Sequence, residues 1–302
     1  MTFTLTATIS GVTSAVTKTA VIVPPAGTID PVSANNSAAD TDLVIYRLWL
    51  PLVAKQPGDS LQWQVALGYE DLSLVTGLND FDYNDWVVQI SSTVSYSTTS
   101  PGRMQKLDMY FIPRARGGGY YHTFQMRFPA QALPSDGTAV LTIYDQNRRV
   151  ISTQTQAYHG NAENVFDIFQ NTSTVFPGGP VNVVEGAPLV PPQRFADLSI
   201  TFDTPFVFDV PAAGLSLPHG QGLFFDPTLL VLNTGDEIHV GDLRLLSVPI
   251  SNWLWPEEGV RIDRAYPGVV YVPGSPPSFS FSPLWWTNFN HCVYDGQVCG
   301  TP

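Results

Sequence analysis

The sequence GYEDLSLVTGLNDFDYNDWVVQI occupies residues 68–90 and connects two apolar segments through a short acidic turn. The segments on either side, residues 60–72 and 85–97, are rich in β-branched and aromatic residues, which favour strands. Four oxygen-bearing side chains fall within the turn: Asp80, Asp82, Asn84 and Asp85. The sequence therefore predicts two β-strands whose connection concentrates negative charge at one end of a sheet.

Further segments of the same character follow along the chain. They cover residues 42–54, 109–113, 122–128, 138–145, 148–156, 195–206 and 237–240. Turn residues separate many of them at intervals of about 8–12 residues, which is typical of an antiparallel sandwich. Two stretches carry helix signals: residues 161–170 are amphipathic, and residues 256–266 open with a proline and two glutamates. We predict an all-β fold, a jelly-roll-like antiparallel β-sandwich with long loops and one or two short helices.

The composition agrees with an all-β fold and restricts the partners. Hydrophobic residues make up 44% of the 302 residues and charged residues only 13%, against about 25% charged in ordinary soluble domains. The net charge of −12 repels phosphate backbones, so we expect no nucleic-acid partner. No apolar run reaches the roughly 18 residues that a membrane span needs. The N-terminus also lacks the charged and apolar regions of a signal peptide.

The first part of the chain differs from the rest. Residues 3–23 alternate Thr and Ser with apolar residues, and residues 24–42 are rich in Pro, Ser, Asn and Ala. The second of these stretches reads as a loop. We therefore predict an N-terminal arm or added strand plus linker over residues 1–40. The β-sandwich domain is expected over residues 41–302, either as one body or as two packed sub-units.

The acidic turn is a candidate cation site. Glu70 and Asp71 stand at the end of the preceding strand and add two carboxylates to the four oxygen-bearing side chains of the turn. Calcium takes six to eight oxygen ligands in flexible geometry, whereas magnesium relies more on water and phosphate. The Gly and Glu that an EF-hand requires are missing. An Asx-turn, in which Asp and Asn side chains accept from backbone amides, is the alternative, and the residues alone leave both open.

Cys292 and Cys299 are the only cysteines of the chain and are separated by a six-residue spacer around Asp295-Gly296. A turn in this spacer would allow a short disulfide to close in an oxidising setting. Two reduced thiols are the alternative.

Other features do not indicate catalysis. The five histidines are scattered without metalloprotease spacing, and the nucleophile motif G-x-S-x-G is missing, so we predict no enzyme. Residues 114–121 (RARGGGYY) lack the ending of a phosphate-binding loop, and we interpret them as a hairpin tip with an arginine bridging the acidic turn. The tryptophan pairs around residues 253–255 and 285–286 are expected to fill the core, with sugar stacking as the alternative.

Three motifs occur in a fixed order between about residues 42 and 290. The first is Tyr69-Glu70-Asp71-Leu72 followed by Asp80-Phe81-Asp82-Tyr83-Asn84-Asp85 and an apolar strand. The second comprises Pro113, Arg114, Ala115, Arg116, Gly117, Tyr121, His122 and Phe124. The third comprises Pro249, Trp253, Trp255, Pro256, Glu257, Ile262, Ala265, Tyr266 and Pro267. Together they resemble the LruC-type domain (the DUF4842 family).

This resemblance implies a surface-associated β-sandwich with a calcium site. Its ligands would be Glu70, Asp71, Asp80, Asp82, Asn84 and Asp85. We therefore expect a non-enzymatic structural or adhesive surface protein with a structural calcium ion. The missing signal peptide favours a virion component, such as a minor capsid or vertex protein, with other structural or capsid proteins as partners. The alternative is a calcium-dependent glycan-binding module of a secreted bacterial protein, located extracellularly or at the cell surface and bound to surface glycans.

Overall fold

The computed structural model of the chain describes residues 15–21, 37–43, 60–73, 79–208, 223–249, 253–274, 277–290 and 292–294. The chain divides into two compact units, Met1–Trp49 and Leu50–Pro302. In the first unit, strands β1 (Ala15–Val21) and β2 (Ser37–Leu43) pair antiparallel. The prediction of a loop throughout residues 24–42 is therefore wrong at its C-terminal end, where the backbone pairing with β1 overrides the local composition. The strand predicted over residues 42–54 lies largely outside the described residues.

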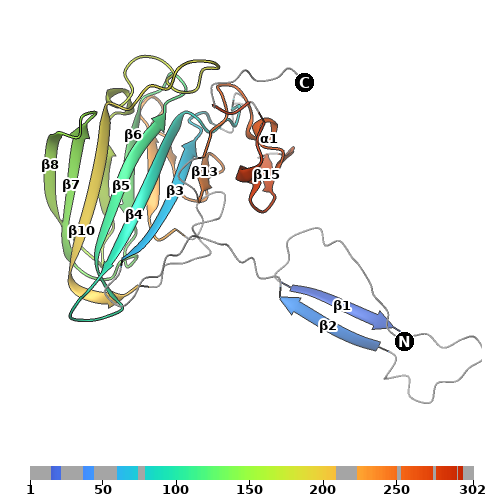
Figure 1. The fold of residues 1–302 in the computed structure, drawn as a ribbon, viewed down its shortest axis with the longest axis horizontal. Helices are drawn as coiled ribbons and strands as arrows, with labels where there is room; N and C mark the ends of the chain where they lie inside the picture. Colours follow the sequence, from blue (N-terminus) through green and yellow to red (C-terminus); the bar gives the residue numbers. More distant parts are fainter. Residues whose placement is uncertain are drawn as a thin grey trace, which may run out of the picture. The chain divides into compact units, whose positions relative to one another are not determined.

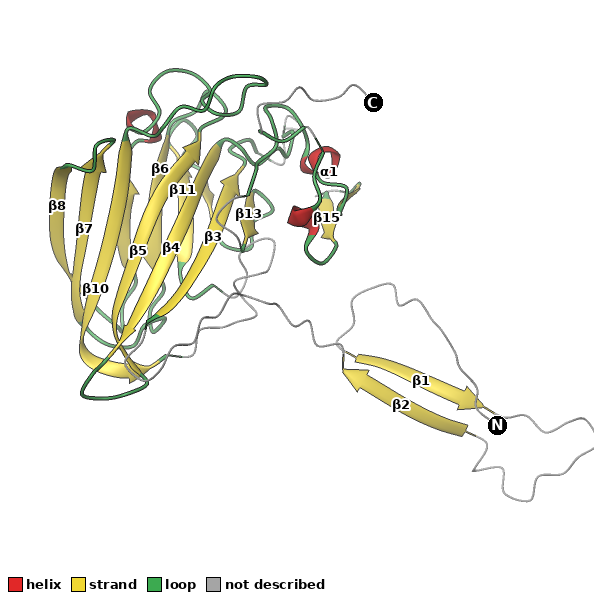
Figure 2. Ribbon diagram, viewed as in Figure 1, coloured by secondary structure: helices red, strands yellow, loops and turns green. Residues whose placement is uncertain are grey.

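The second unit is built from two main antiparallel sheets (Figures 1 and 2). The larger has the strand order β13-β3-β4-β5-β10-β7-β8. Its strands are β3 (Leu61–Tyr69), β4 (Trp86–Tyr96), β5 (Arg103–Ala115), β7 (Gly137–Asp145), β8 (Val150–Tyr158), β10 (Arg194–Val207) and β13 (Leu245–Val248). The smaller has the order β12-β11-β6-β9. Its strands are β6 (His122–Phe128), β9 (Asn164–Phe169), β11 (Asp226–Val231) and β12 (Glu237–Ile238).

The core between the two sheets follows the alternation of their strands. On β4, the side chains of Trp86, Val88 and Ile90 are buried in the main hydrophobic cluster. On the opposite sheet, β6 buries Phe124 and Phe128 in the same cluster. The rings of Trp86 and Phe124 are 6.3 Å apart, so side chains from the two sheets interdigitate. The predicted all-β antiparallel sandwich is confirmed, with sheets of seven and four strands, larger than the eight strands of a jelly roll.

A second hydrophobic cluster forms where the C-terminal segment packs against the sandwich. This segment contains the short helix α1 (Ile262–Ala265) and a hairpin of β14 (Val269–Val272) and β15 (Ser278–Phe281). Trp253, Trp255 and Trp285 are 3–5% exposed and belong to this second cluster, so these three rings fill a core. Short 3-10 turns at Thr172–Thr174 and Trp285–Thr287 complete the helical content of the described residues.

Both predicted helices need correction. The helix predicted at 161–170 is wrong, because Asn164–Phe169 forms strand β9 and pairs with β6. Its burial alternates along Asn164–Ile168 with a period of two, and the sheet contact decides the conformation where the local pattern allowed both. The helix predicted at 256–266 is reduced to Ile262–Ala265, since Pro256 instead forms a β-bridge with Val293. None of the helices in the described residues is long and apolar enough to span a membrane.

Candidate metal centre

The acidic turn folds back onto the end of β3. The amide of Asp85 donates to the carbonyl of Tyr69, the last residue of β3, at 3.1 Å. The amide of Asp71 donates to Oδ2 of Asp85 at 2.7 Å. Strand β4 begins directly after Asp85, with Trp86 buried between the sheets. The two ends of the acidic sequence are therefore held together at one end of the larger sheet.

The backbone of the turn takes an uncommon conformation. Phe81 and Tyr83 have φ angles of 56° and 55°, in the left-handed region that costs a non-glycine residue about 1–2 kcal/mol. Both side chains are buried in the second hydrophobic cluster, and the Tyr83 hydroxyl donates to the carbonyl of Leu243 at 2.7 Å. Asp80 and Asp82, which alternate with these two residues along the chain, instead come together with Glu70. The strained backbone thus separates the apolar from the acidic side chains of the turn.

Five carboxylates from two short stretches, residues 70–71 and 80–85, converge at this turn. In each of two sets, one ligand oxygen from every member lies within 4.8 Å of the others: Glu70, Asp80 and Asp82, and Glu70, Asp71 and Asp85. Glu70 belongs to both sets. All are buried except Asp80, which is partly exposed. Five of the six ligands predicted from the sequence therefore lie together.

Glu70 is the most exceptional member of the cluster. Its side chain is 0% exposed, and within the described part of the chain neither carboxylate oxygen has a hydrogen-bond donor. Burial raises the pKa of Glu70 well above its ordinary value, and the charges of Asp85, Asp82 and Asp80 add to the shift. Glu70 and Asp85 can share a hydrogen bond only if one of them is protonated, because two carboxylates offer no donor.

Asp82 and Asp85 share this electrostatic situation. Burial is the main cause that raises the pKa of each well above its ordinary value, followed by the charge of Asp85 on Asp82 and of Asp71 on Asp85. Backbone amides oppose the shift, because Gly259 donates to Oδ2 of Asp82 at 2.8 Å. An Asx-type bond also exists, from the amide of Asn84 to Oδ1 of Asp82 at 3.2 Å. The Asx-turn and the acidic cluster are therefore parts of one structure.

Asn84, the sixth predicted ligand, is fully buried beside the cluster. Its Nδ2 donates to the carbonyl of Pro256 at 3.1 Å, and among the described residues Oδ1 has no donor. A Cβ atom placed on Gly117 would collide with this Oδ1 and would lie 2.9 Å from Oε2 of Glu258. The amide oxygen of Asn84 and the carboxylate of Glu258 therefore flank the same glycine.

Glu258 and the glycine run contribute to the site although the sequence interpretation did not include them. Glu258 is more exposed than the predicted ligands, and its carboxylate accepts from the amide of Gly118. Burial raises its pKa, and the charge of Asp80 adds to this. Gly118 has a φ of 52° and approaches so closely that an added Cβ would lie 2.5 Å from Oδ1 of Asp85. The paired glutamates after Pro256 were a signal that could have indicated this contact.

The predicted arginine bridge to the acidic turn is wrong. The guanidinium of Arg116 donates to the carbonyls of Gly178 and Gly179, and that of Arg114 donates to Oε1 of Gln89. Gly117 and Gly118, which follow Arg116, approach the cluster closely, whereas the two arginine side chains bind other partners. Within the described ranges, none of the ion pairs joins a Lys or an Arg to the cluster.

His122 supports the site from the first residue of β6. Its Nε2 lies 2.9 Å from Oδ2 of Asp71, and its Nδ1 lies 3.3 Å from the hydroxyl of Thr172. The ring is completely buried, so these two contacts fix its orientation. By its contact with Asp71, His122 orients the carboxylate of Asp71, as residues behind a metal ligand commonly orient that ligand.

This arrangement suits a hard cation. Two oxygens bound to one calcium ion at 2.3–2.6 Å can be up to about 5 Å apart, which is the spread of each carboxylate set. The candidate ligand atoms of both sets are all carboxylate oxygens, and neither set contains a thiolate, the softer ligand that selects zinc or copper.

Cys292 is a member of neither carboxylate set. Cys292 is disulfide-bonded, whereas Cys299, the only other cysteine of the chain, lies outside the described residues.

Comparison with known proteins adds little to this picture. No family model matches the sequence, and no curated protein matches it. Among solved structures, a chain described as a "Putative lipoprotein from Bacteroides ovatus" is similar, with a TM-score of 0.47 and 14% identity over 77% of this chain and 75% of that chain. The resemblance to the LruC-type domain stays a hypothesis that rests on the three sequence motifs.

Proposed function

We propose that this protein is a non-enzymatic structural or adhesive surface protein whose β-sandwich is stabilised by a calcium ion at the acidic cluster. The observation that carries the proposal is Glu70, a fully buried carboxylate without a hydrogen-bond donor among the described residues. Its neighbours are further carboxylates, which a bare turn would leave in mutual repulsion. A divalent cation supplies the missing positive charge and the missing partner at once.

Calcium fits this site better than magnesium. The predicted ligands come from the two residues after β3 and from the turn, with Glu258 from a distant segment beside them, so no single element fixes their geometry. Calcium accepts six to eight such ligands, whereas magnesium demands a near-ideal octahedron at 2.0–2.1 Å and retains water. The low exposure of Glu70, Asp82 and Asp85 leaves little room for retained water.

The burial of the site also supports a structural ion over one that contacts a glycan. A sugar hydroxyl can reach an ion only through an open coordination position, and four of the five converging carboxylates are buried. An enclosed ion would stabilise the fold because it binds the folded chain and not the unfolded one. Within this class, a virion component such as a minor capsid or vertex protein is our preferred role, and a secreted bacterial surface protein is the alternative.

The calcium proposal is tested by metal analysis and thermal unfolding of the full-length protein. Protein purified without chelator should contain calcium, and excess EDTA should lower its melting temperature. Added calcium should restore the melting temperature more effectively than magnesium at the same concentration. Identical melting curves with EDTA and with calcium would overturn the proposal.

The surface role needs a separate measurement. Antibodies against the folded protein should label the outside of intact virions or cells that carry it. Labelling only after the particles or cells are broken open would contradict a surface role without affecting the metal site.

A further inference from the structure

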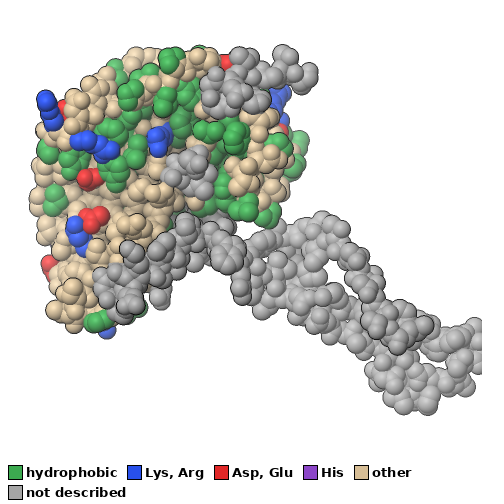
Figure 3. Space-filling model, in the orientation of Figure 1, with side chains coloured by type: hydrophobic (Ala, Val, Ile, Leu, Met, Phe, Trp, Pro, Cys, Tyr) green, Lys and Arg blue, Asp and Glu red, His purple; other side chains and the backbone are tan. Residues whose placement is uncertain are grey.

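The outer face of the seven-stranded sheet carries a pocket that is separate from the acidic cluster. Figure 1 shows this sheet toward the viewer, and Figure 3 shows the same face with separate basic and acidic side chains among hydrophobic and other uncharged ones. The pocket has a volume of about 390 Å³, within the range of roughly 300–1,000 Å³ that small-molecule sites occupy. Its lining comes from the four neighbouring strands β4, β5, β10 and β7.

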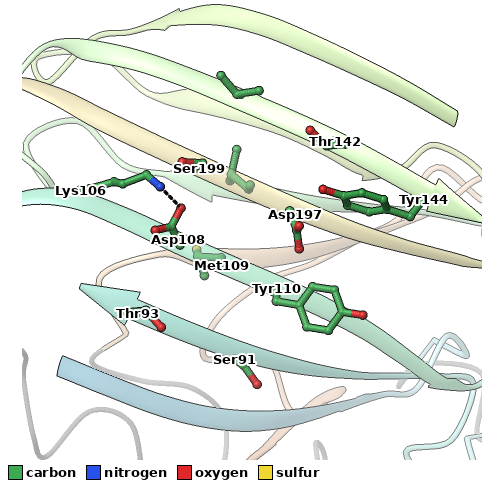
Figure 4. A pocket seen from close by; sticks show the side chains of 12 residues that line it. Ser91, Thr93, Lys106, Asp108, Met109, Tyr110, Thr142, Tyr144, Asp197 and Ser199 are labelled. Atoms are coloured by element: carbon green, nitrogen blue, oxygen red, sulfur yellow. Dashed lines mark ion pairs between the residues drawn. The ribbon is translucent and has the colours of Figure 1, made fainter. Parts of the chain in front are cut away.

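Two cross-strand rows form most of the lining (Figure 4). The pairing of the strands sets Ser91, Tyr110, Asp197 and Thr142 side by side in the first row. It sets Thr93, Asp108, Ser199 and Val140 side by side in the second row, two residues further along each strand. Each row thus contains one carboxylate and at least two hydroxyls. Such diagonal positions on adjacent strands lie about 7–8 Å apart, so Asp108 and Asp197 can contact two ends of one small ligand.

Both carboxylates already have a neighbour that positions them. Asp108 forms an ion pair with Nζ of Lys106 at 2.8 Å, and Figure 4 shows the two side chains beside each other on β5. Asp197 accepts a hydrogen bond from the Tyr144 hydroxyl. Burial raises the pKa of Asp197, although the bond from Tyr144 and the charge of Arg148 oppose this. A carboxylate offers about four lone-pair positions, so each retains acceptor capacity for a ligand.

One lining residue, Tyr110, belongs to an aromatic pair at the side of the pocket. The rings of Tyr110 and Phe195 are stacked at 6.3 Å with an interplanar angle of 16°. The guanidinium of Arg148 lies 4.8 Å from the Tyr110 ring centre and 4.2 Å from that of Phe195. The Tyr110 hydroxyl is buried and has no hydrogen-bond partner within the described ranges. The aromatic pair and the Arg148 guanidinium on its ring faces give this side of the pocket both an apolar and a polar component, which suits an amphipathic ring-shaped ligand.

We propose that this pocket binds a neutral sugar unit of a glycan, independently of calcium. The pocket and its rim combine Lys106 and Arg148 with Asp108 and Asp197, so their charges balance and favour neither a polyanion nor a polycation. A sugar carries closely spaced hydroxyls that both donate and accept. Paired carboxylates can accept from its hydroxyls, and serine and threonine hydroxyls can complete the contacts. The open, multi-strand face allows the rest of the glycan to continue beyond the pocket.

The probe is an array of neutral gluco-, manno-, galacto- and xylo-oligosaccharides, applied to the full-length protein in calcium and in EDTA below its melting temperature. The best binder is then measured by isothermal titration calorimetry. We expect binding in both buffers, and at least a tenfold loss of affinity in Asp108→Asn and in Asp197→Asn. The matched control is Asp203→Asn, an exposed position on β10 that does not line the pocket.

The outcomes separate this inference from the calcium proposal. Binding that disappears in EDTA while the protein remains folded would overturn a calcium-independent pocket. No binding to any neutral oligosaccharide, or equal affinity in Asp197→Asn and the control, would also overturn it. Melting temperatures of the variants must match that of the control, and a variant that unfolds is replaced by Ser199→Val, which fills the floor without changing charge. None of these results depends on whether calcium occupies the acidic cluster.

Discussion

Replacement of Glu70 by glutamine should change stability in opposite directions with and without calcium. In the metal-free protein, Glu70 lies within 4.8 Å of two pairs of carboxylates. At an effective dielectric constant of about 20, two ionised carboxylates at that distance, such as Glu70 and one of its neighbours, repel each other by about 3 kcal/mol. Glutamine removes this repulsion and provides an amide donor to Asp82 or Asp85. The metal-free Glu70→Gln variant should therefore be more stable than the parent by about 1–3 kcal/mol, since bound protons already relieve part of the repulsion.

In calcium the sign should reverse, because glutamine is a weaker ligand than glutamate. Calcium at a thousand times its dissociation constant stabilises the folded parent by about 4 kcal/mol, which exceeds the gain of about 1–3 kcal/mol in the metal-free variant. If the variant loses this stabilisation, it should be less stable than the parent in calcium by about 1–3 kcal/mol, which lowers its melting temperature by about 2–12 °C in a domain of this size. Differential scanning calorimetry in EDTA and across a calcium series measures both effects. The control is Glu163→Gln, at an exposed loop position, which should leave both curves unchanged.

The same experiment can refute the reasoning. A Glu70→Gln variant that is destabilised equally in EDTA and in calcium would show that Glu70 acts through an ordinary polar contact. A variant that remains fully stabilised by calcium would show that Glu70 is not a ligand.

Three further predictions follow from the site and the core. The pKa values of Asp82 and Asp85 are raised in the folded protein, so in EDTA the folded state retains protons that the unfolded state releases above about pH 4. The free energy of unfolding of the metal-free protein should therefore decrease as the pH rises from about 4 towards the folded pKa values. Stabilisation by calcium should therefore be greatest near neutral pH and shrink towards about pH 4, and urea unfolding that shows a constant calcium effect would contradict this. Gly118→Ala should lower the free energy of unfolding by at least about 1–2 kcal/mol and weaken calcium binding in a titration, because Gly118 has a positive φ and contacts Asp85. The control Gly119→Ala should be nearly neutral, because an added Cβ there meets no atom within 4 Å. Equal effects of the two substitutions would refute the close packing of Gly118. Phe124→Ala should lower the free energy of unfolding by about 3–5 kcal/mol, as measured by urea denaturation with and without calcium, and a cost below about 1 kcal/mol would show that the two sheets do not pack through this ring.

The sandwich could be predicted because its strands carry strong local signals. β4 and β6 combine β-branched or aromatic residues with alternating burial, so pattern and tertiary contact agree. Residues 164–169 show where the sequence was insufficient. Their apolar positions suit a helix as well as a strand, and only pairing with β6 decides between them. Short strands such as β13, which pairs with β3 over four residues, depend on partners far along the chain and had no distinctive local pattern.

The acidic cluster could be predicted in part for a similar reason. Asp80, Asp82 and Asp85 are close in sequence, and a turn must bring them near the end of the preceding strand. Glu258 is contributed by a segment more than 170 residues away, as shown by the bond from Gly259 to Asp82, so sequence proximity could not reveal it. The arginines of residues 114–116 illustrate the opposite error. They are close to the site in sequence, but their side chains are directed to other partners.

The position of the acidic cluster explains why its charge state should affect the whole second unit. Trp86, directly after the turn, belongs to the core between the sheets, whereas Phe81 and Tyr83 within the turn belong to the C-terminal cluster. The turn is tied to the C-terminal segment by backbone bonds, including that from Ile262 to the carbonyl of Phe81 at 2.9 Å. Repulsion among the carboxylates therefore acts at the junction of two cores, where the left-handed backbone already adds strain. A bound cation would remove that repulsion at the point where both cores and the loop around Gly118 meet, so a single ion can influence packing on both sides.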